Sequence, residues 1–271
     1  MLFLYDLPNW MMGVLIVGAC MGVMVGGYLL IRRRIRTVFT DAQVGAALAF
    51  LGVLATVTSL LLAFSAVSVW ESFNTAESSV TAEANEAAQL ARDLAVYGPE
   101  AFPTREALRG YLRLAVDKEW PLLTRAESSA EAWNQLDEIF REAARIEPTS
   151  PRQEVLMGEI WARINALTRS RRDRMHASQA SVPGTLWTVV LAGSVLTFAM
   201  TLVLPLSRFS VTLVACLAAS MGLVFFFIVA MDHPFAGAEA VGSGPLQSTL
   251  ANMQRWDEAA QKSLIGPPKR G

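Results

Sequence analysis

Charged side chains, cysteine and histidine are all scarce in this chain of 271 residues. Asp, Glu, Lys and Arg make up 17% of it, below the roughly 25% of a soluble domain, whereas apolar residues reach 53%. With two cysteines and two histidines, the sequence predicts neither a disulfide framework nor a cysteine-based metal site. It also lacks a nucleophile elbow, a phosphate-binding loop and a His–carboxylate metal motif. We therefore expect no enzyme activity and no cofactor.

Four uncharged stretches are each long enough to cross the hydrocarbon core of a bilayer, which takes about 20 helical residues. They run over Trp10–Ile31, Val44–Val69, Leu186–Leu206 and Phe209–Met231. The sequence therefore predicts an all-α integral membrane protein. Its four transmembrane helices form two hairpins that flank a soluble helical segment, and the lipid bilayer is its first expected partner.

The expected division of the chain follows these four spans. An N-terminal hairpin covers 1–70, a soluble helical domain 71–183, a C-terminal hairpin 184–231 and a tail 232–271. The central domain has no period-2 alternation long enough for a strand, so we expect helices throughout. It carries eighteen acidic and fourteen basic residues, a balance that disfavours nucleic acid as a partner.

Glycine, proline and capping residues mark the helix ends in the central domain. Beyond Glu71 the second span continues without either breaker until Gly98-Pro99, so one helix extends from the membrane into the soluble region. Ser128 has capping-box spacing to Glu131 and is expected to start a later helix. Ser150, followed by proline, is expected to start the last soluble helix.

Small hydroxyl residues recur along the second span at alternating steps of three and four, the spacing of a heptad seam. The seam consists of Thr58, Leu61, Ser65, Ser68, Ser72, Thr75 and Ser79, and the first five are the candidates for lining a pore. In a ring of subunits these side chains would line a pore for inorganic ions, with Leu61 as an apolar constriction. Alternatively, the small hydroxyl residues let helices pack closely and hydrogen-bond in lipid. Both alternatives predict self-association or close helix packing along this face.

Acidic residues follow the second span before any basic residue appears. Repeated around a ring, Glu71, Glu83 and Glu86 would form an acidic vestibule that attracts cations. Alternatively, they form an ordinary solvated helix face. The basic cluster over Arg169–Arg174 would either pair with these glutamates or contact lipid headgroups. We expect pairing, because the cluster lies at a similar depth on a neighbouring helix.

Basic residues near the ends of the spans indicate the topology, because they are enriched on the cytoplasmic side. The hairpin turns contribute Arg32, Arg33, Arg34, Arg36 and Arg208. The other side contributes Arg169, Arg171, Arg172 and Arg174, which lie in a long connection where the rule counts charges weakly. We therefore expect the hairpin turns inside the cell and the central domain outside the cytoplasm.

Short motifs along nearly the whole chain resemble the bacterial bestrophin-like family, a domain family of unknown function. They are Trp70-Glu71-Ser72-Phe73, Glu83-Ala84, Tyr111, Glu119-Trp120-Pro121, Arg171, Arg174, Pro183 with Leu186-Trp187, and Asp232-His233-Pro234-Phe235-Ala236-Gly237. The resemblance implies kinship with bestrophins, which are pentameric chloride-selective channels lined by the second transmembrane helix. It thus implies a homo-oligomeric ion channel of the bacterial inner membrane, with a pentamer and anion conduction among the family's properties.

Three features depart from bestrophins. Bestrophin necks use bulky apolar and aromatic residues, whereas this seam is mostly Ser and Thr, and no compact acidic loop here resembles the bestrophin calcium clasp. Bestrophins also hold their soluble domain in the cytosol, opposite to the arginine distribution found here. The resemblance therefore does not carry chloride selectivity or calcium gating to this chain. The competing hypothesis is a non-conducting membrane scaffold or sensor that binds a protein partner through its helical domain.

Overall fold

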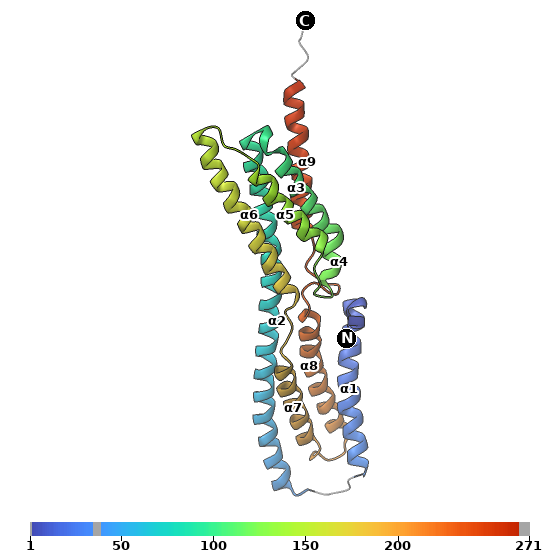
Figure 1. The fold of residues 1–271 in the computed structure, drawn as a ribbon. Helices are drawn as coiled ribbons and strands as arrows, with labels where there is room; N and C mark the ends of the chain where they lie inside the picture. Colours follow the sequence, from blue (N-terminus) through green and yellow to red (C-terminus); the bar gives the residue numbers. More distant parts are fainter. Residues whose placement is uncertain (1, 35–38, 266–271) are drawn as a thin grey trace. The chain divides into compact units, whose positions relative to one another are not determined.

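The computed structural model describes residues 2–34 and 39–265, with side chains over residues 4–34 and 39–258. Every regular element in these residues is a helix (Figure 1). Four of the helices are long and apolar enough to cross a membrane: α1 (Asn9–Arg34), α2 (Asp41–Tyr97), α7 (Gly184–Thr201) and α8 (Arg208–Met231). This confirms the predicted all-α class with four spans.

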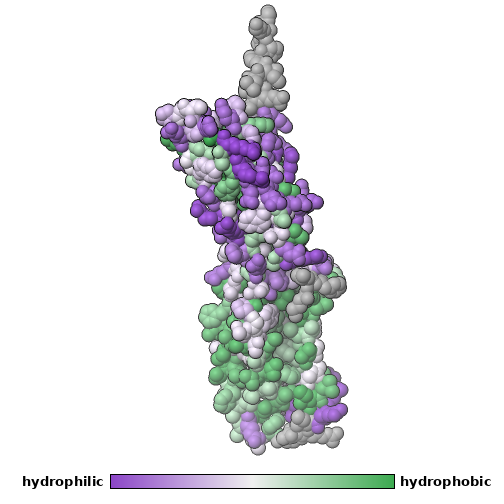
Figure 2. Space-filling view, in the orientation of Figure 1, coloured by the Kyte–Doolittle hydropathy of each residue, from purple (hydrophilic) through white to green (hydrophobic). Residues whose placement is uncertain are grey.

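The chain folds into two compact units. The first comprises Met1–Phe73 and Ala180–Ala240, and the second comprises Asn74–Gln179 and Val241–Gly271. Residues of α2 belong to both. The helices of the first unit carry mostly apolar surface, and those of the second unit carry mostly polar surface (Figure 2).

The second span is one continuous helix of 57 residues, as the sequence predicts. A capping box starts it: the Gln43 N–H donates to Thr40 Oγ1 at 3.4 Å, and the Thr40 N–H donates to Gln43 Oε1 at 2.9 Å. The helix ends at Tyr97 because Gly98 adopts a φ of 126°, which is strained for residues with a Cβ. Pro99 follows and cannot extend the ladder.

In the first unit, α1 and α8 lie side by side (Figure 1). Gly222 of α8 permits this approach, because a Cβ there would lie 3.0 Å from the Val17 Cα of α1. The fully buried Tyr28 ties α1 to the turn between α7 and α8. Its hydroxyl lies 3.2 Å from the Leu204 carbonyl oxygen and 2.9 Å from that of Pro205. The third span, expected to reach residue 206, ends earlier, at Thr201.

The second unit is a bundle of helices around an apolar core. Besides the end of α2, it contains η2 (Pro99–Ala101), α3 (Phe102–Leu114), the π-helical turn η3 (Ala115–Glu119), α4 (Trp120–Leu123), α5 (Ala130–Ala144), α6 (Pro151–Ser178) and α9 (Gly244–Ile265). The remaining short element, η1 (Leu2–Asp6), belongs to the first unit. The core residues Leu90, Leu108, Ile139 and Ile160 are fully buried and come from four different helices.

The predicted caps are correct at one helix and shifted by one residue at another. Ser150 caps α6 by accepting the Gln153 N–H at 3.3 Å, as expected. The expected cap Ser128 is wrong, because Ser129 has the extended backbone and its Oγ accepts the Ala132 N–H at 3.3 Å. Both serines lie in the same short polar stretch, so sequence spacing alone did not separate them.

The C-terminal tail forms a helix that packs on the second unit. Leu246 and Met253 of α9 enter its core. Thr249 Oγ1 donates to the Ala84 carbonyl oxygen of α2 at 3.2 Å. Asp257 forms ion pairs with Arg105 and Arg109 of α3. These contacts make α9 part of the helical bundle.

We predict that Gly222→Ala destabilises the first unit. The added methyl group would meet the backbone of α1 at 3.0 Å, which cannot move aside as a flexible side chain could. Overpacking of this kind costs about 1–3 kcal/mol, more than the gain of about 1 kcal/mol in helix propensity. Thermal unfolding of the purified protein in detergent should show a lower Tm.

Gly18→Ala is the matched control, because among the described residues nothing beyond its chain neighbours and the adjacent backbone of its own helix lies within 4 Å of its added Cβ. Its Tm should be unchanged or higher. Equal Tm values for the two variants would contradict the close α1–α8 contact.

Candidate functional site

Two of the five seam residues expected to line a pore are buried within the chain. Thr58 is 3% exposed, and its Oγ1 lies 3.1 Å from Thr197 Oγ1 of α7. Gly193 of α7 lies against the same threonine, since a Cβ there would come within 3.0 Å of Thr58 Oγ1. Ser65 is 2% exposed and donates to the Leu61 carbonyl oxygen at 2.9 Å. These two residues thus serve the close helix packing that was the alternative expectation for the seam.

The other three of these five residues lie nearer the surface of the subunit. Leu61 and Ser72 are half-buried, and Ser68 is exposed. The structure therefore does not place the five residues together on one exposed face. Their assignment to a pore stays a prediction, and the burial of Thr58 and Ser65 weighs against those two members.

A different stripe of α2 is exposed along the span. Its residues recur at alternating steps of three and four, and each is more than half exposed: Phe50, Val53, Val57, Leu60, Phe64 and Val67. The same spacing continues through Glu71, Asn74, Ser78, Thr81 and Asn85, which are also exposed. We call the residues from Phe50 to Val67 the apolar stripe and those from Glu71 to Asn85 the polar stripe. Both stripes are therefore exposed among the described residues.

The glutamates expected to form a vestibule occupy three different environments. Glu71 is exposed on the polar stripe. Glu86 is half-buried and accepts a hydrogen bond from Arg163 Nη1 at 3.2 Å. Glu83 is fully buried and pairs with Arg174, so it does not face solvent, and the expected vestibule loses this residue.

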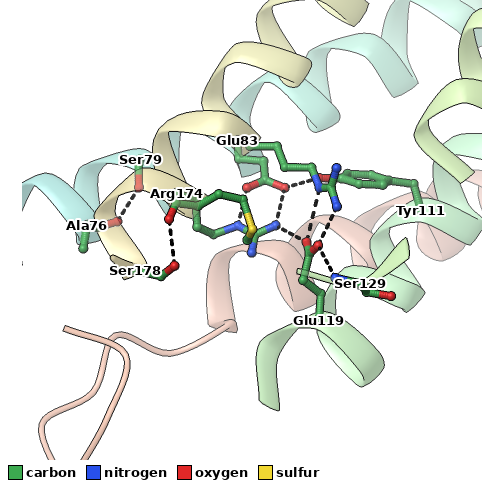
Figure 3. A network of polar contacts seen from close by, with 10 residues as sticks. Ala76, Ser79, Glu83, Tyr111, Glu119, Ser129, Arg174 and Ser178 are labelled. Atoms are coloured by element: carbon green, nitrogen blue, oxygen red, sulfur yellow. Dashed lines mark hydrogen bonds and ion pairs between the residues drawn. The ribbon is translucent and has the colours of Figure 1, made fainter. Parts of the chain in front are cut away.

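Glu83 belongs to a buried network of four charges in the second unit (Figure 3). Arg174 Nε donates to Glu83 Oε2 at 2.6 Å, and Arg174 Nη2 donates to Glu119 Oε2 at 2.8 Å. Arg171 Nε donates to Glu119 Oε2 at 3.2 Å. The expected pairing of the basic cluster with a glutamate of the extended span is thereby confirmed for Arg174. The two carboxylates balance the two guanidinium groups, so this network is neutral.

Local structure explains how the four side chains meet. Arg171 and Arg174 are three residues apart on α6, so they point from one face of that helix. The π-helical turn η3 presents Glu119, in keeping with the tendency of π-turns to occur where a side chain needs a special direction. The Ser129 N–H, at the start of α5, donates to Glu119 Oε1 at 3.2 Å and satisfies a further lone pair.

Aromatic side chains surround the two guanidinium groups. The Arg171 Cζ lies 3.8 Å from the ring centre of Trp133, and the Arg174 Cζ lies 5.3 Å from that of Trp120. Cation–π attraction strengthens in such a desolvated place. Tyr111 lies 5.8 Å from Arg171 Cζ and donates its hydroxyl hydrogen to Glu83.

The protonation states follow from these contacts. Burial alone would raise the pKa of Glu119, but the hydrogen bonds and positive charges of Arg171 and Arg174 outweigh burial and lower it. Burial, together with the negative charge of Glu83, raises the pKa of Tyr111 well above its ordinary value. Glu119 is therefore ionised at neutral pH, and Tyr111 keeps the proton that it donates.

The sequence signalled this network only in part. Pairing between Glu83 and the arginines was expected, but Glu119 and Tyr111 were not expected to join them. All of these residues are nevertheless among those that carry the family resemblance, so short motifs far apart in sequence converge on one buried site. Within the described residues no group of His, Cys, Asp and Glu side chains is arranged to hold a metal ion.

We predict that Glu119→Gln lowers the stability of the protein at pH 7. The change leaves an excess positive charge in a fully buried site, and breaking a buried ion pair costs about 3–5 kcal/mol. Because the folded pKa of Glu119 is lowered, its ionised form contributes stability above its unfolded pKa of about 4.3. This contribution is lost as pH falls through the folded pKa. Thermal unfolding at several pH values measures both effects.

Glu138→Gln provides the control, since Glu138 pairs at 2.6 Å with an Arg141 whose side chain is 63% exposed. Exposed pairs contribute about 0–1 kcal/mol. The gap in Tm between the unsubstituted protein and Glu119→Gln should narrow in acid. A Glu119→Gln variant as stable at pH 7 as Glu138→Gln would contradict the assigned role.

Comparison with known proteins adds two findings. Two variants of a bacterial bestrophin homologue from Klebsiella pneumoniae share this fold, each with a TM-score of 0.60. Their identities are 13% and 12%, and the alignments cover 91% and 90% of this chain and 95% of theirs. A further membrane protein variant aligns at a TM-score of 0.59 and 12% identity, over 91% of this chain and 95% of its own. No curated protein sequence matches the chain.

These identities show similarity of fold alone. Family membership is shown by the sequence match, in which the model of the bestrophin-like domain covers residues 11–246. That range includes α2, α7 and α8, nearly all of α1, and the whole buried charge network. The chain is a multi-pass membrane protein that belongs to the bestrophin-like family.

Proposed function

We propose that this chain is one subunit of a homo-oligomeric ion channel whose pore is lined by α2. The observation that carries the proposal is the apolar stripe, which follows one helix from Phe50 to Val67 and is exposed in the part of the chain that the structure describes. Membership of the bestrophin-like family supports the same assignment. No covalent chemistry is part of this function.

The residues proposed to line the pore differ from those expected at first. Thr58 and Ser65 are packed against neighbouring helices, so we assign the constriction to Leu60, Phe64 and Val67 of the exposed stripe. A ring of apolar side chains can hold a pore closed by excluding water, and small movements then control its opening. This assignment removes one departure from bestrophins, because bulky apolar and aromatic residues form the constriction here too.

The polar stripe would continue the conducting path. Asn74, Ser78, Thr81 and Asn85 offer amides and hydroxyls that can hydrogen-bond to water and to ions of either sign. Glu71 would place a carboxylate from each subunit at the junction of the two stripes, which favours cations locally. The neutral residues favour neither sign of charge, so Glu71 decides the sign of the conducted ion. Reversal potentials in salt gradients would measure that selectivity.

We predict that Phe64→Ala changes ion flux through the purified protein in liposomes. Removal of a bulky apolar side chain from the constriction lowers the barrier to water and ions. Flux should rise several-fold, or the reversal potential should shift.

Phe209→Ala is the matched control, because Phe209 on α8 is 73% exposed, compared with 62% for Phe64. Ser65→Ala tests the buried seam in the same assay. Both should conduct like the unsubstituted protein. A change with Ser65→Ala and none with Phe64→Ala would return the pore to the hydroxyl seam, and no flux at all would favour the non-conducting scaffold or sensor.

The proposed location is the bacterial inner membrane, with the second unit outside the cytoplasm. Arg171 and Arg174 are buried and paired with carboxylates, so they no longer count as free basic residues beside the third span. Arg169 and Arg172 remain on that side, against the five arginines of the hairpin turns. The charge asymmetry therefore grows from five against four to five against two, in favour of hairpin turns inside.

We predict that alkaline phosphatase fused after Gly271 is active in bacterial cells and that a green fluorescent protein at the same place is dark. Phosphatase folds only outside the reducing cytoplasm, where its disulfides can form. An inactive phosphatase together with a fluorescent green fluorescent protein would place the second unit in the cytosol. A fusion inserted after Arg34 at the first hairpin turn should give the inverse result and serves as the control.

A further inference from the structure

One face of α2 is buried along most of the helix. In the first unit this face comprises Thr58, Leu62, Ser65 and Val69, and in the second unit it comprises Ala76, Ser79, Val80, Glu83, Ala87 and Leu90. The steps of three and four match the stripe exposed on the opposite side. The buried face and the pore-lining stripe are therefore two consequences of one rotational setting of α2. Glu83 is the one charged residue of α2 on this buried face.

We propose that Glu83, through its ion pair with Arg174, fixes the rotation of α2 and so selects the stripe that the helix presents to the pore. Glu83 acts here as a positioning residue and does not contact the ion. The inference rests on the proposed function for its link to the pore. The claim about rotation stands on the geometry of the second unit alone.

Directional bonds make Glu83 suited to this role. Its carboxylate receives Arg174 Nε at 2.6 Å and Arg174 Nη2 at 3.1 Å, both from α6, and the Tyr111 hydroxyl from α3. Apolar contacts are non-directional and tolerate a turn of the helix. Three donors from two other helices accept only one placement of the carboxylate.

The neighbouring sequence offers no substitute for Glu83. Ala82 precedes it and Ala84 follows it. If α2 shifted its register by one residue, it would turn by about 100°. The methyl group of Ala82 or Ala84 would then lie against Arg174 in place of the Glu83 carboxylate. The guanidinium would then be buried with one carboxylate fewer, which is strongly unfavourable. Every other rotation of α2 is thereby penalised.

Single cysteines at Ser79 and Val80 would report the rotation. These residues lie about 100° apart on the helix, on the two flanks of Glu83, and are 7% and 1% exposed. Turning α2 in either direction exposes one flank and buries the other more deeply, whereas loosening the bundle exposes both. The probes are Ser79→Cys and Val80→Cys, each in the full chain with Cys20→Ala and Cys216→Ala. The measurement is the rate of modification by a water-soluble maleimide.

In Glu83→Gln we expect the ratio of the two modification rates to change by about ten-fold, since thiol modification follows exposure. Arg174→Gln should change the ratio in the same direction. Glu119→Gln is the matched control: it removes one charge from the same network and destabilises it, but Glu119 lies on η3, so the ratio should stay unchanged.

Three results would overturn the inference: an unchanged ratio in Glu83→Gln, a parallel rise of both rates, or the same shift in Glu119→Gln. The labelling needs no ion conduction, so its failure is distinct from failure of the channel proposal. If the unsubstituted protein conducts nothing while the ratio shifts as expected, the positioning role stands and the pore assignment falls. If it conducts, Glu83→Gln should also alter flux, and Glu119→Gln should not.

Discussion

Two carboxylates and two guanidinium groups are fully buried together in the second unit, and the helices around them bring these four side chains into contact so that their charges balance. Each ion alone would be too costly to bury, so the four must meet at hydrogen-bonding distance from one another. This requirement dictates the π-turn that directs Glu119, the three-residue spacing of Arg171 and Arg174, and the place of Glu83 on α2. The aromatic rings fill the remaining volume and contact the flat faces of the guanidinium groups.

The same helix meets a different demand in the first unit, where lipid surrounds the protein and burial of apolar area gives little driving force. Close approach and hydroxyl contacts then hold helices together. The hydroxyls of Thr58 and Thr197 are in contact beside the small Gly193. The Ser65 hydroxyl donates a hydrogen bond to the Leu61 carbonyl oxygen. Hydroxyls therefore suit the buried face of α2 in lipid, whereas a charge network suits the same face in the second unit.

Much of the architecture could be predicted from the sequence because its causes are local. The length and uncharged composition of the spans predicted the four membrane helices, and the helix breakers Gly98-Pro99 predicted the end of α2. Pairing of Arg174 with Glu83 also followed from complementary charge at a similar depth. Glu119 was missed because a π-turn directs it, and no residue pattern in Ala115–Glu119 announces that turn. Ser129 replaced Ser128 as a cap for a similar reason, since only the backbone at that point separates two adjacent serines.

The face proposed for the pore could not be predicted from periodicity, because α2 carries two heptad patterns at once. Thr58 and Ser65 are one heptad apart in sequence, and so are Leu60 and Val67, with Phe64 between them. Both sets therefore fit a helix seam. What separates them is tertiary: α7 and α8 cover the hydroxyl set and leave the apolar set bare. Large apolar side chains in a membrane helix are expected to face lipid. The sequence therefore favoured the hydroxyl residues as the candidates to line a water-filled pore. Because helix packing accounts for the hydroxyls, the exposed apolar stripe of α2 is the face that we propose for the pore, with an apolar constriction as its gate.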